Sequence, residues 1–293
     1  MQQNVSEKDN PPAVRMIALD LDGTALLSDH AHISRRLRRT LQRAVARGIR
    51  VVPVTGRIYS VLPKDVTSVP GIEYAVTSYG AVIYALKERR TLFSACIPRQ
   101  DAEWILRLAR RESCYVEAWS RGRIFVPDDQ FRRIETLPFS PLHSDVLRKI
   151  GTAAGGSADF WAKHGEAVEK INFPLLPPAQ KATILGKLAQ CPRLFFVPMQ
   201  SGFEIVRAGA TKADGLANFC RLLQQKGVSI GMRNILAIGD SEGDAEMIRK
   251  AGIGVAMGNA SRALKKLADA VTLDNERDGA AAAIERYALS GCA

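Results

Sequence analysis

The sequence predicts an α/β fold in which a parallel sheet flanked by helices is interrupted by an inserted α+β domain. Strand and helix patterns alternate at the start of the chain and again at its end, which is typical of a parallel sheet. The middle shows mostly strand patterns separated by short turns, which favours antiparallel pairing. With 293 residues, 46% of them hydrophobic, the chain is long enough to form two domains.

The two ends of the chain contain the parallel-sheet patterns. Residues 14–20 and 49–54 are near-continuous apolar runs, which predicts strands buried on both faces. Between them, Leu37, Leu41 and Val45 recur every four residues, as on one face of a helix. Near the C-terminus, helix, strand, helix and strand are expected at 211–226, 234–239, 242–250 and 252–257.

The middle of the chain has a different pattern. Five apolar segments look like strands, namely RTLFSACI, CYVEAW, RIFVP, VEKINF and RLFFVP, and convincing helix patterns occur at 98–112 and 178–190. A short Ser-Arg-Gly turn between CYVEAW and RIFVP predicts an antiparallel pair. The Pro-rich residues 136–142 and the Gly-Ser segment 151–157 are expected to be loops.

These patterns set the expected domain boundaries. Residues 14–85 and 204–293 are expected to form the parallel-sheet core, and residues 86–203 the inserted α+β domain. Residues 1–13 are polar, lack the apolar core of a signal peptide, and are expected to be a disordered N-terminal tail.

The composition excludes several classes of protein. No stretch approaches the roughly 20 apolar residues of a membrane span, so we expect a cytoplasmic protein without a membrane partner. The five cysteines are scattered and contain no CxxC pair, so neither a disulfide framework nor a zinc site is expected.

The net charge of +11 leaves two interpretations open. Six arginines between Arg35 and Arg47 fall on the predicted helix, where a solvated helix face is favoured over a nucleic-acid surface. No RNA- or DNA-binding motif accompanies them, so nucleic acid is not the expected partner. A positive field would also attract a phosphorylated metabolite, so charge alone does not distinguish a nucleic-acid partner from a phosphorylated substrate.

The strongest functional signal is D20-L-D22-G-T, directly after the first strand. Asp20 and Asp22 leave the sheet at its carboxyl edge, where open α/β sheets bind ligands. A lone DxD pair is usually a solvated turn, but the apolar strand before it and the Gly-Thr after it favour a functional site. Because adjacent buried carboxylates need a compensating cation, a hard metal such as Mg²⁺ is expected.

Three further segments carry polar groups at comparable positions. Thr55 and Gly56 follow the second strand, where a hydroxyl and backbone N–H groups can bind a phosphoryl oxygen. Lys212 begins a predicted helix and would place an ammonium beside phosphoryl charge. Asp240 and Asp244 follow the strand at 234–239. Each is ordinary by itself, as a turn, a surface lysine or a helix N-cap.

In this order, DLDGT, TGR, Lys212 and GDSEGD resemble the four motifs of haloacid dehalogenase (HAD)-like hydrolases. The resemblance is to the Cof-type branch (type IIB), with a large α/β cap between the second and third motifs. It extends from Asp20 to Gly279 and includes IVRAGATKADGL and AGIGVAMGNAS. It implies a Rossmann-like core, a cap at 86–203 that closes over the substrate, and one Mg²⁺ per site.

The resemblance also implies a role for each acid. Asp20 would attack phosphorus and become an aspartyl-phosphate. Asp22 would protonate the leaving oxygen and then take a proton from the attacking water. Mg²⁺ would be held by the Asp20 carboxylate, the Asp22 backbone carbonyl and Asp240, with Asp244 in support.

The resemblance also implies which residues bind phosphate, and the sequence departs from the family pattern at two positions. Thr55 and Lys212 would hold the phosphoryl group, and Gly56 would let the loop approach closely. The family usually has Asn where this chain has Gly243, and often Asn where it has Tyr79. Both departures are expected to alter specificity and to leave the nucleophile, the acid/base and the main metal ligand in place.

We expect a phosphatase acting on a small phosphorylated metabolite, such as a sugar phosphate or a phosphorylated cofactor. The alternatives are a phosphotransferase or phosphomutase of the same fold, and a non-catalytic protein that binds nucleic acid through its basic surface. His30 and His32 form an HxH pair that is more often solvent-exposed than metal-binding, so no role is assigned to it. The sequence indicates neither the particular substrate nor the oligomeric state.

Overall fold

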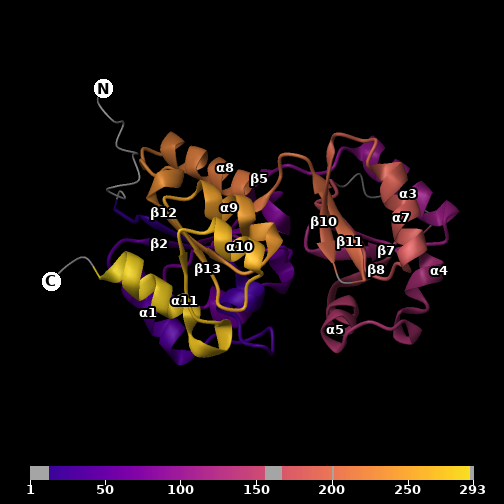
Figure 1. Ribbon diagram of the computed structural model, residues 1–293. Helices are drawn as coiled ribbons and strands as arrows, with labels where there is room; N and C mark the ends of the chain where they lie inside the picture. The colour runs from indigo at the N-terminus through magenta and orange to yellow at the C-terminus, as the bar shows by residue number, and fades with distance from the viewer. Residues whose placement is uncertain (1–12, 156–166, 200, 291–293) are drawn as a thin grey trace, which may run out of the picture. The chain divides into compact units, whose positions relative to one another are not determined.

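The computed structural model describes residues 13–155, 167–199 and 201–290 (Figure 1). Internal contacts divide the chain into two compact units. The first unit comprises Met1–Gly56, Leu62–Phe93 and Thr211–Ala293, and the second comprises Arg57–Val61 and Ser94–Ala210. Apart from Ala13, the predicted tail at residues 1–13 lies outside the described residues.

The first unit is built on a five-stranded parallel sheet of order β14-β13-β12-β1-β2. Leu19 lies beside Pro53 on one side and Ile238 on the other, so β1, β2 and β12 end at the same edge. This parallel core confirms the α/β class predicted from the sequence. The strands are β1 (Met16–Leu19), β2 (Arg50–Pro53), β12 (Ile235–Gly239), β13 (Ile253–Ala256) and β14 (Ala270–Val271).

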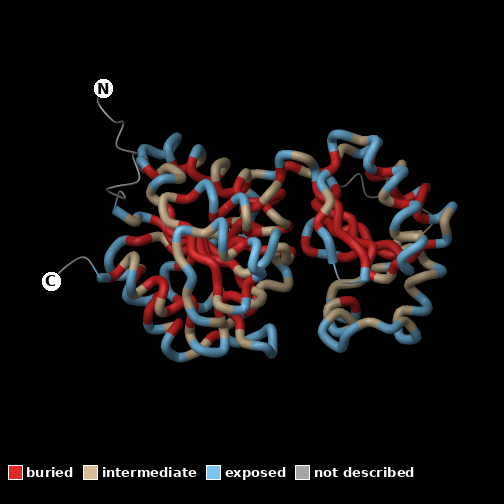
Figure 2. The backbone as a smooth tube through the Cα atoms, in the orientation of Figure 1, coloured by how far each residue is buried: buried red, intermediate tan, exposed pale blue. Residues whose placement is uncertain are grey.

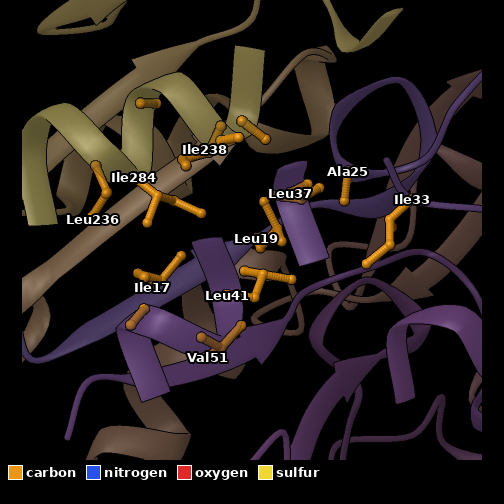
Figure 3. Packing of buried hydrophobic residues seen from close by; sticks show 14 of the residues in the cluster. Ile17, Leu19, Ala25, Ile33, Leu37, Leu41, Val51, Leu236, Ile238 and Ile284 are labelled. Atoms are coloured by element: carbon orange, nitrogen blue, oxygen red, sulfur yellow. The ribbon is translucent and has the colours of Figure 1, made fainter. Parts of the chain in front are cut away.

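Helices cover both faces of this sheet because side chains alternate along each strand. Ile17 and Leu19 pack against α1 (Arg35–Ala46) and α11 (Gly279–Ile284), as Figure 3 shows. The other two residues of β1 face α8 (Lys212–Gln225). The central strands β1 and β12 are buried throughout their length (Figure 2), whereas Val271 in the edge strand β14 is exposed. Each large apolar side chain buried here is worth about 1.5–3 kcal/mol, so the sheet is held from both sides.

Helix α1 has the amphipathic character expected of the arginine-rich segment. Leu37, Leu41 and Ala44 are buried in the core, and the arginines lie on the outer side. Arg36 bonds to Glu285 after α11, and Arg38 bonds to Asp65 in α2 (Lys64–Thr67). Since these arginines have partners within the fold, the solvated helix face remains the favoured interpretation.

A small antiparallel sheet continues the first unit beyond β2. Its order is β3-β4-β5, with β3 (Tyr74–Thr77), β4 (Val82–Ala85) and β5 (Arg90–Ser94). Val76 in β3 forms a parallel bridge with Val54, the residue after β2. The sequence-based boundary at 85/86 would separate β5 from this sheet, whereas its pairing with β4 keeps most of it in the first unit.

The second unit contains a six-stranded sheet of order β10-β11-β9-β6-β7-β8. Neighbouring strands are antiparallel, except that β7 and β8 are parallel. The mixed sheet confirms the inserted α+β domain, including the antiparallel pair around the Ser-Arg-Gly turn. The strands are β6 (Glu117–Ser120), β7 (Arg123–Val126), β8 (Gly151–Ala153), β9 (Lys170–Phe173), β10 (Leu194–Met199) and β11 (Gly202–Arg207).

Two helices share a hydrophobic core with this sheet. They are α3 (Arg99–Arg111) and α7 (Pro178–Leu188), close to the ranges predicted. The sequence-based boundary at 203/204 falls inside β11, whereas pairing with β9 and β10 keeps β11 in the second unit. Within the described residues, no helix has the length and apolar character needed to cross a membrane. The other α-helices among the described residues are α4 (Asp128–Phe131), α5 (Pro141–Ile150), α9 (Ala245–Lys250) and α10 (Arg262–Leu267).

The loop predictions for residues 136–142 and 151–157 were partly wrong. Pro141 begins α5, because Ser140 caps the helix by accepting from the His143 N–H and proline suits the first turn. Residues 151–153 form β8 because they pair with β7. Residues 156 and 157 lie outside the described part of the chain.

The segment Arg57–Val61, directly after Gly56, makes its contacts with the second unit. The Tyr59 hydroxyl donates to the Arg121 carbonyl at 2.8 Å, and the Ser60 hydroxyl donates to the Gly122 carbonyl at 2.7 Å. These bonds attach the segment to the turn between β6 and β7.

The packing of α8 depends on Gly215. An added Cβ there would lie 2.5 Å from Val76 Cγ1 and 2.7 Å from Gly80 Cα. We expect Gly215→Ala to lower the free energy of unfolding by about 1–3 kcal/mol, because the helix and the β3 turn must separate. Gly186 in α7 has open space around it, so the control Gly186→Ala should add up to about 1 kcal/mol through helix propensity. Differential scanning calorimetry measures both, and a Gly215→Ala protein as stable as the parent would contradict the close packing.

Candidate active site

The residues singled out in the sequence meet at the carboxyl edge of the parallel sheet. Asp20 directly follows β1, Thr55 lies two residues after β2, and Asp240 directly follows β12. The Asp20 backbone N–H donates to the Ile238 carbonyl at 3.1 Å, which keeps Asp20 in line with the sheet. Lys212 is the first residue of α8 and approaches from the helix layer.

Three carboxylates form one cluster, in which Asp20, Asp240 and Asp244 each offer an oxygen within 4.8 Å of the others. Asp20 and Asp244 are buried and Asp240 is partly buried. Asp244 is held by its own loop, since its Oδ2 accepts from the Ser241 N–H at 3.0 Å and the Ser241 hydroxyl at 2.8 Å. Gly239 permits this approach, because a Cβ there would lie 2.5 Å from the Asp244 Cγ.

Lys212 is the cation that faces this cluster. Its Nζ donates to Asp20 Oδ1 and to Asp244 Oδ1, both at 2.6 Å, and its side chain is buried. A capping box fixes the start of α8: the Asp214 N–H donates to the Thr211 hydroxyl, and the Thr211 N–H donates to the Asp214 carboxylate. The helix start therefore determines where the ammonium lies.

The cluster holds more negative than positive charge. Burial raises the pKa of Asp20 well above its usual range, and Asp244 and Asp240 raise it further while Lys212 opposes them. Burial and Asp244 also raise the pKa of Asp240. Burial alone would lower the pKa of Lys212, but Asp20 and Asp244 outweigh it and raise the pKa, so the lysine stays charged. The uncompensated charge and the oxygen ligands fit a hard divalent cation.

Asp22 lies in a different environment from Asp20, and its carboxylate is not part of the three-carboxylate cluster. Its side chain is 39% exposed, against 5% for Asp20, and its Oδ1 lies 2.9 Å from the Nδ1 of His30. The next residue, Gly23, has φ +75° and passes so close to Asp240 that a Cβ would lie 2.4 Å from Oδ2. This turn keeps one acid inside the protein and the other near solvent.

Thr55 and Gly56 contact the turn that follows β3. Thr55 is buried, and its carbonyl accepts from the Tyr79 N–H at 3.0 Å. Tyr79 has φ +62°, a left-handed conformation that is uncommon for a bulky residue. Its ring packs on Gly56, where a Cβ would lie 2.7 Å from Cε2, and its centroid lies 5.9 Å from the Nζ of Lys212. Tyr79 therefore lines the site between the Thr55 loop and α8.

The two departures, Tyr79 and Gly243, lie against each other. A Cβ at position 243 would lie 3.3 Å from the Cε1 of Tyr79, closer than an ordinary contact. A larger side chain there would need space that the ring occupies. The two departures are therefore one coupled change in packing.

The sequence assigned no role to two residues that the structure places at the site. The Asn259 Nδ2 donates to the Gly23 carbonyl at 2.8 Å and so ties the loop after β13 to the turn after β1. Its signal is its position shortly after a parallel strand, within the phrase AGIGVAMGNAS. His30 bonds to Asp22 from a loop whose conformation no sequence pattern marks.

The charge balance predicts a large loss of stability when the lysine is removed. Lys212→Met leaves Asp20 and Asp244 buried without their cation, so the free energy of unfolding should fall by about 3–5 kcal/mol. Urea unfolding in EDTA measures this loss. Adding Asp244→Asn to Lys212→Met should recover part of it, since an amide oxygen still accepts from the Ser241 loop without the charge. Equal losses in the single and double variants would contradict this account.

Three comparisons with known proteins extend these observations. Residues 17–284 match the family model of haloacid dehalogenase-like hydrolases. Phosphatase YwpJ of Bacillus subtilis is 29% identical over 92% of this chain and 98% of its own length. The 5-amino-6-(5-phospho-D-ribitylamino)uracil phosphatase YcsE of the same organism is 28% identical over 94% and 96%. The solved structure of BT4131, a sugar phosphatase of HAD subclass IIB, is alike in fold, with a TM-score of 0.75 at 20% identity over 94% of this chain and 99% of that one.

The family model spans most of the described fold and contains all four motifs. The chain therefore belongs to the haloacid dehalogenase-like hydrolases, and the two relatives that it matches over most of their length are phosphatases.

Proposed function

We propose that this chain hydrolyses a small phosphorylated metabolite with Mg²⁺ through an aspartyl-phosphate on Asp20. The observation that carries the proposal is the meeting of Asp20, Asp240 and Asp244 with Lys212 at the end of the parallel sheet. A nucleophile, oxygen ligands for a cation and a fixed ammonium are the groups that phosphoryl transfer needs.

Mg²⁺ suits this donor set because every ligand is an oxygen, and because three carboxylates face one ammonium at the cluster. The carboxylates of Asp20 and Asp240 and the backbone carbonyl of Asp22 would hold the ion. Asp244 would support them from its loop and through Lys212. When bound, the ion offsets the charge of the phosphoryl oxygens.

Asp20 and Asp22 would divide the covalent and proton chemistry. An Asp20 oxygen bonds to phosphorus as the ester P–O bond breaks, and Asp22 gives its proton to the departing oxygen. Asp22 then takes a proton from the water that hydrolyses the aspartyl-phosphate, which restores both residues and releases phosphate. The difference in exposure supports this division, since Asp22 can exchange protons with solvent and Asp20 is enclosed.

Thr55, Gly56 and Lys212 would bind the phosphoryl group. Thr55 would contribute its hydroxyl and Gly56 its backbone, while the Tyr79 ring occupies the space where a side chain at position 56 would lie. Lys212 donates to the Asp20 oxygen at 2.6 Å and would stabilise charge that develops beside it.

The proposed substrate class is a sugar phosphate or a phosphorylated cofactor. YcsE is named for a ribitylamino-uracil phosphate and BT4131 is a sugar phosphatase.

A panel of sugar phosphates and phosphorylated cofactors tests the proposal by phosphate release, with Mg²⁺ and with EDTA. Release should require Mg²⁺, and Asp20→Asn should lower kcat by at least about a thousandfold, because no other group here can take its covalent role. Asp129→Asn, the same change at an exposed acid of the second unit, is the matched control and should keep full activity.

The same samples separate the alternatives. Transfer of phosphate to an added sugar in preference to water would instead identify a phosphotransferase. Strongly salt-dependent nucleic-acid binding that survives Asp20→Asn, without any phosphate release, would favour the non-catalytic alternative.

The coupled packing of Tyr79 and Gly243 predicts a coupled effect on activity. Gly243→Asn should lower kcat/KM by about tenfold to a hundredfold, since the ring must shift against Gly56 and the phosphate-binding loop. Tyr79→Asn, which tolerates the left-handed backbone, should remove the conflict, so the double variant should lose less than Gly243→Asn alone. Steady-state kinetics on the four proteins measure the coupling, and additive losses would argue against it.

A further inference from the structure

The loop after the first motif brings a histidine onto the proposed acid and base. The His30 Nδ1 lies 2.9 Å from Asp22 Oδ1, within hydrogen-bonding distance. The Asp22 side chain is 39% exposed, against 5% for Asp20, so packing restricts its rotamer less than that of Asp20. The hydrogen bond to the His30 imidazole restricts the rotation of the Asp22 side chain.

The loop itself holds His30 in an unusual conformation. His30 has φ +57°, in the left-handed region that few non-glycine residues adopt. Its N–H donates to the Leu27 carbonyl at 2.9 Å. The Asp29 carboxylate accepts from the Ala31 N–H at 2.9 Å and the His32 N–H at 3.0 Å, which closes the turn. Local bonds thus maintain the backbone strain that directs the imidazole.

A distant segment anchors the same loop. The Ser28 N–H and hydroxyl both donate to Glu276 Oε1, at 2.7 and 2.6 Å. The Asn275 side chain donates to the Leu26 carbonyl at 2.9 Å, and Leu26 is fully buried. Leu26 and Ser28, which precede His30, are therefore both hydrogen-bonded to the C-terminal part of the first unit.

We infer that His30 is a positioning residue, which holds the Asp22 carboxylate in the orientation that transfers a proton to the leaving oxygen. The inference rests on the proposed function, because Asp22 must be the acid. His30 acts through Asp22 and needs no contact with substrate. His32, two residues on, bonds instead to Asp29 at 2.6 Å and provides an internal comparison.

Leaving-group dependence separates this role from a general structural one. An alkyl ester needs a proton on its departing oxygen, whereas p-nitrophenolate is stable enough to leave without one. Loss of His30 should therefore slow glucose 6-phosphate or another alkyl substrate from the panel much more than p-nitrophenyl phosphate. A loosened fold or metal site would slow both.

The experiment compares kcat/KM for both esters with the full chain in saturating Mg²⁺, because kcat/KM reports the steps up to release of the leaving group and excludes hydrolysis of the aspartyl-phosphate, which both esters share. His30→Gly suits the left-handed backbone, and His30→Ala removes the ring from a strained one. Both should lower the alkyl-to-aryl ratio of kcat/KM about tenfold. His30→Asn should keep most of the parent's ratio, because the Nδ2 of asparagine can take the place of the imidazole Nδ1 and asparagine tolerates the left-handed backbone. His32→Ala should leave the ratio unchanged.

Asp22→Asn distinguishes failure of this inference from failure of the proposed function. A fall in the ratio for Asp22→Asn, with no fall for His30→Gly and His30→Ala, would overturn the role of His30 alone. An unchanged ratio in Asp22→Asn would show that Asp22 is not the general acid, which would contradict the proposed function and with it the role of His30. Equal losses on both esters in the His30 variants, or the same fall in His32→Ala, would also overturn it.

Discussion

The gathering of three carboxylates, two of them buried, beside the ends of parallel strands is the constraint on which the rest of the first unit depends. Asp20 and Asp240 are brought together by the strands that precede them, and their repulsion must be offset inside the protein. Lys212 does so only because α8 begins beside the sheet edge and packs closely on β3 through Gly215. The charge balance at the carboxylates therefore depends on the packing of α8 against the sheet.

Two acids with the same chemical group acquire different properties through backbone geometry. Asp20 continues the line of β1 into the protein, and the turn at Gly23 carries Asp22 toward solvent. Gly23 has no side chain, so Asp240 can approach the same turn from the other side. Environment rather than residue type separates the enclosed carboxylate of Asp20 from the more exposed carboxylate of Asp22.

Whether the sequence predicts a residue's position depends on what places it. Asp20 and Asp240 follow apolar strands, and parallel strands that end at one edge bring such residues together. Asn259 also follows a strand, but the direction in which its loop turns back has no sequence signal. His30 and Tyr79 depend on left-handed backbone conformations that no periodicity marks. The membership of β5 and β11 likewise depends on pairing partners, which apolar composition does not specify.

The attachment of Arg57–Val61 to the second unit bears on how such proteins diversify. The chain passes between the two units four times rather than twice, and the first of these crossings comes directly after Gly56. Tyr59 and Ser60 donate hydrogen bonds to the backbone of the β6–β7 turn. If residues 94–210 were replaced by those of another protein, these two residues would face a different turn unless they were exchanged as well. Recombination that exchanges residues 94–210 alone is therefore disfavoured, and inherited changes in this unit must stay compatible with the segment that directly follows Gly56.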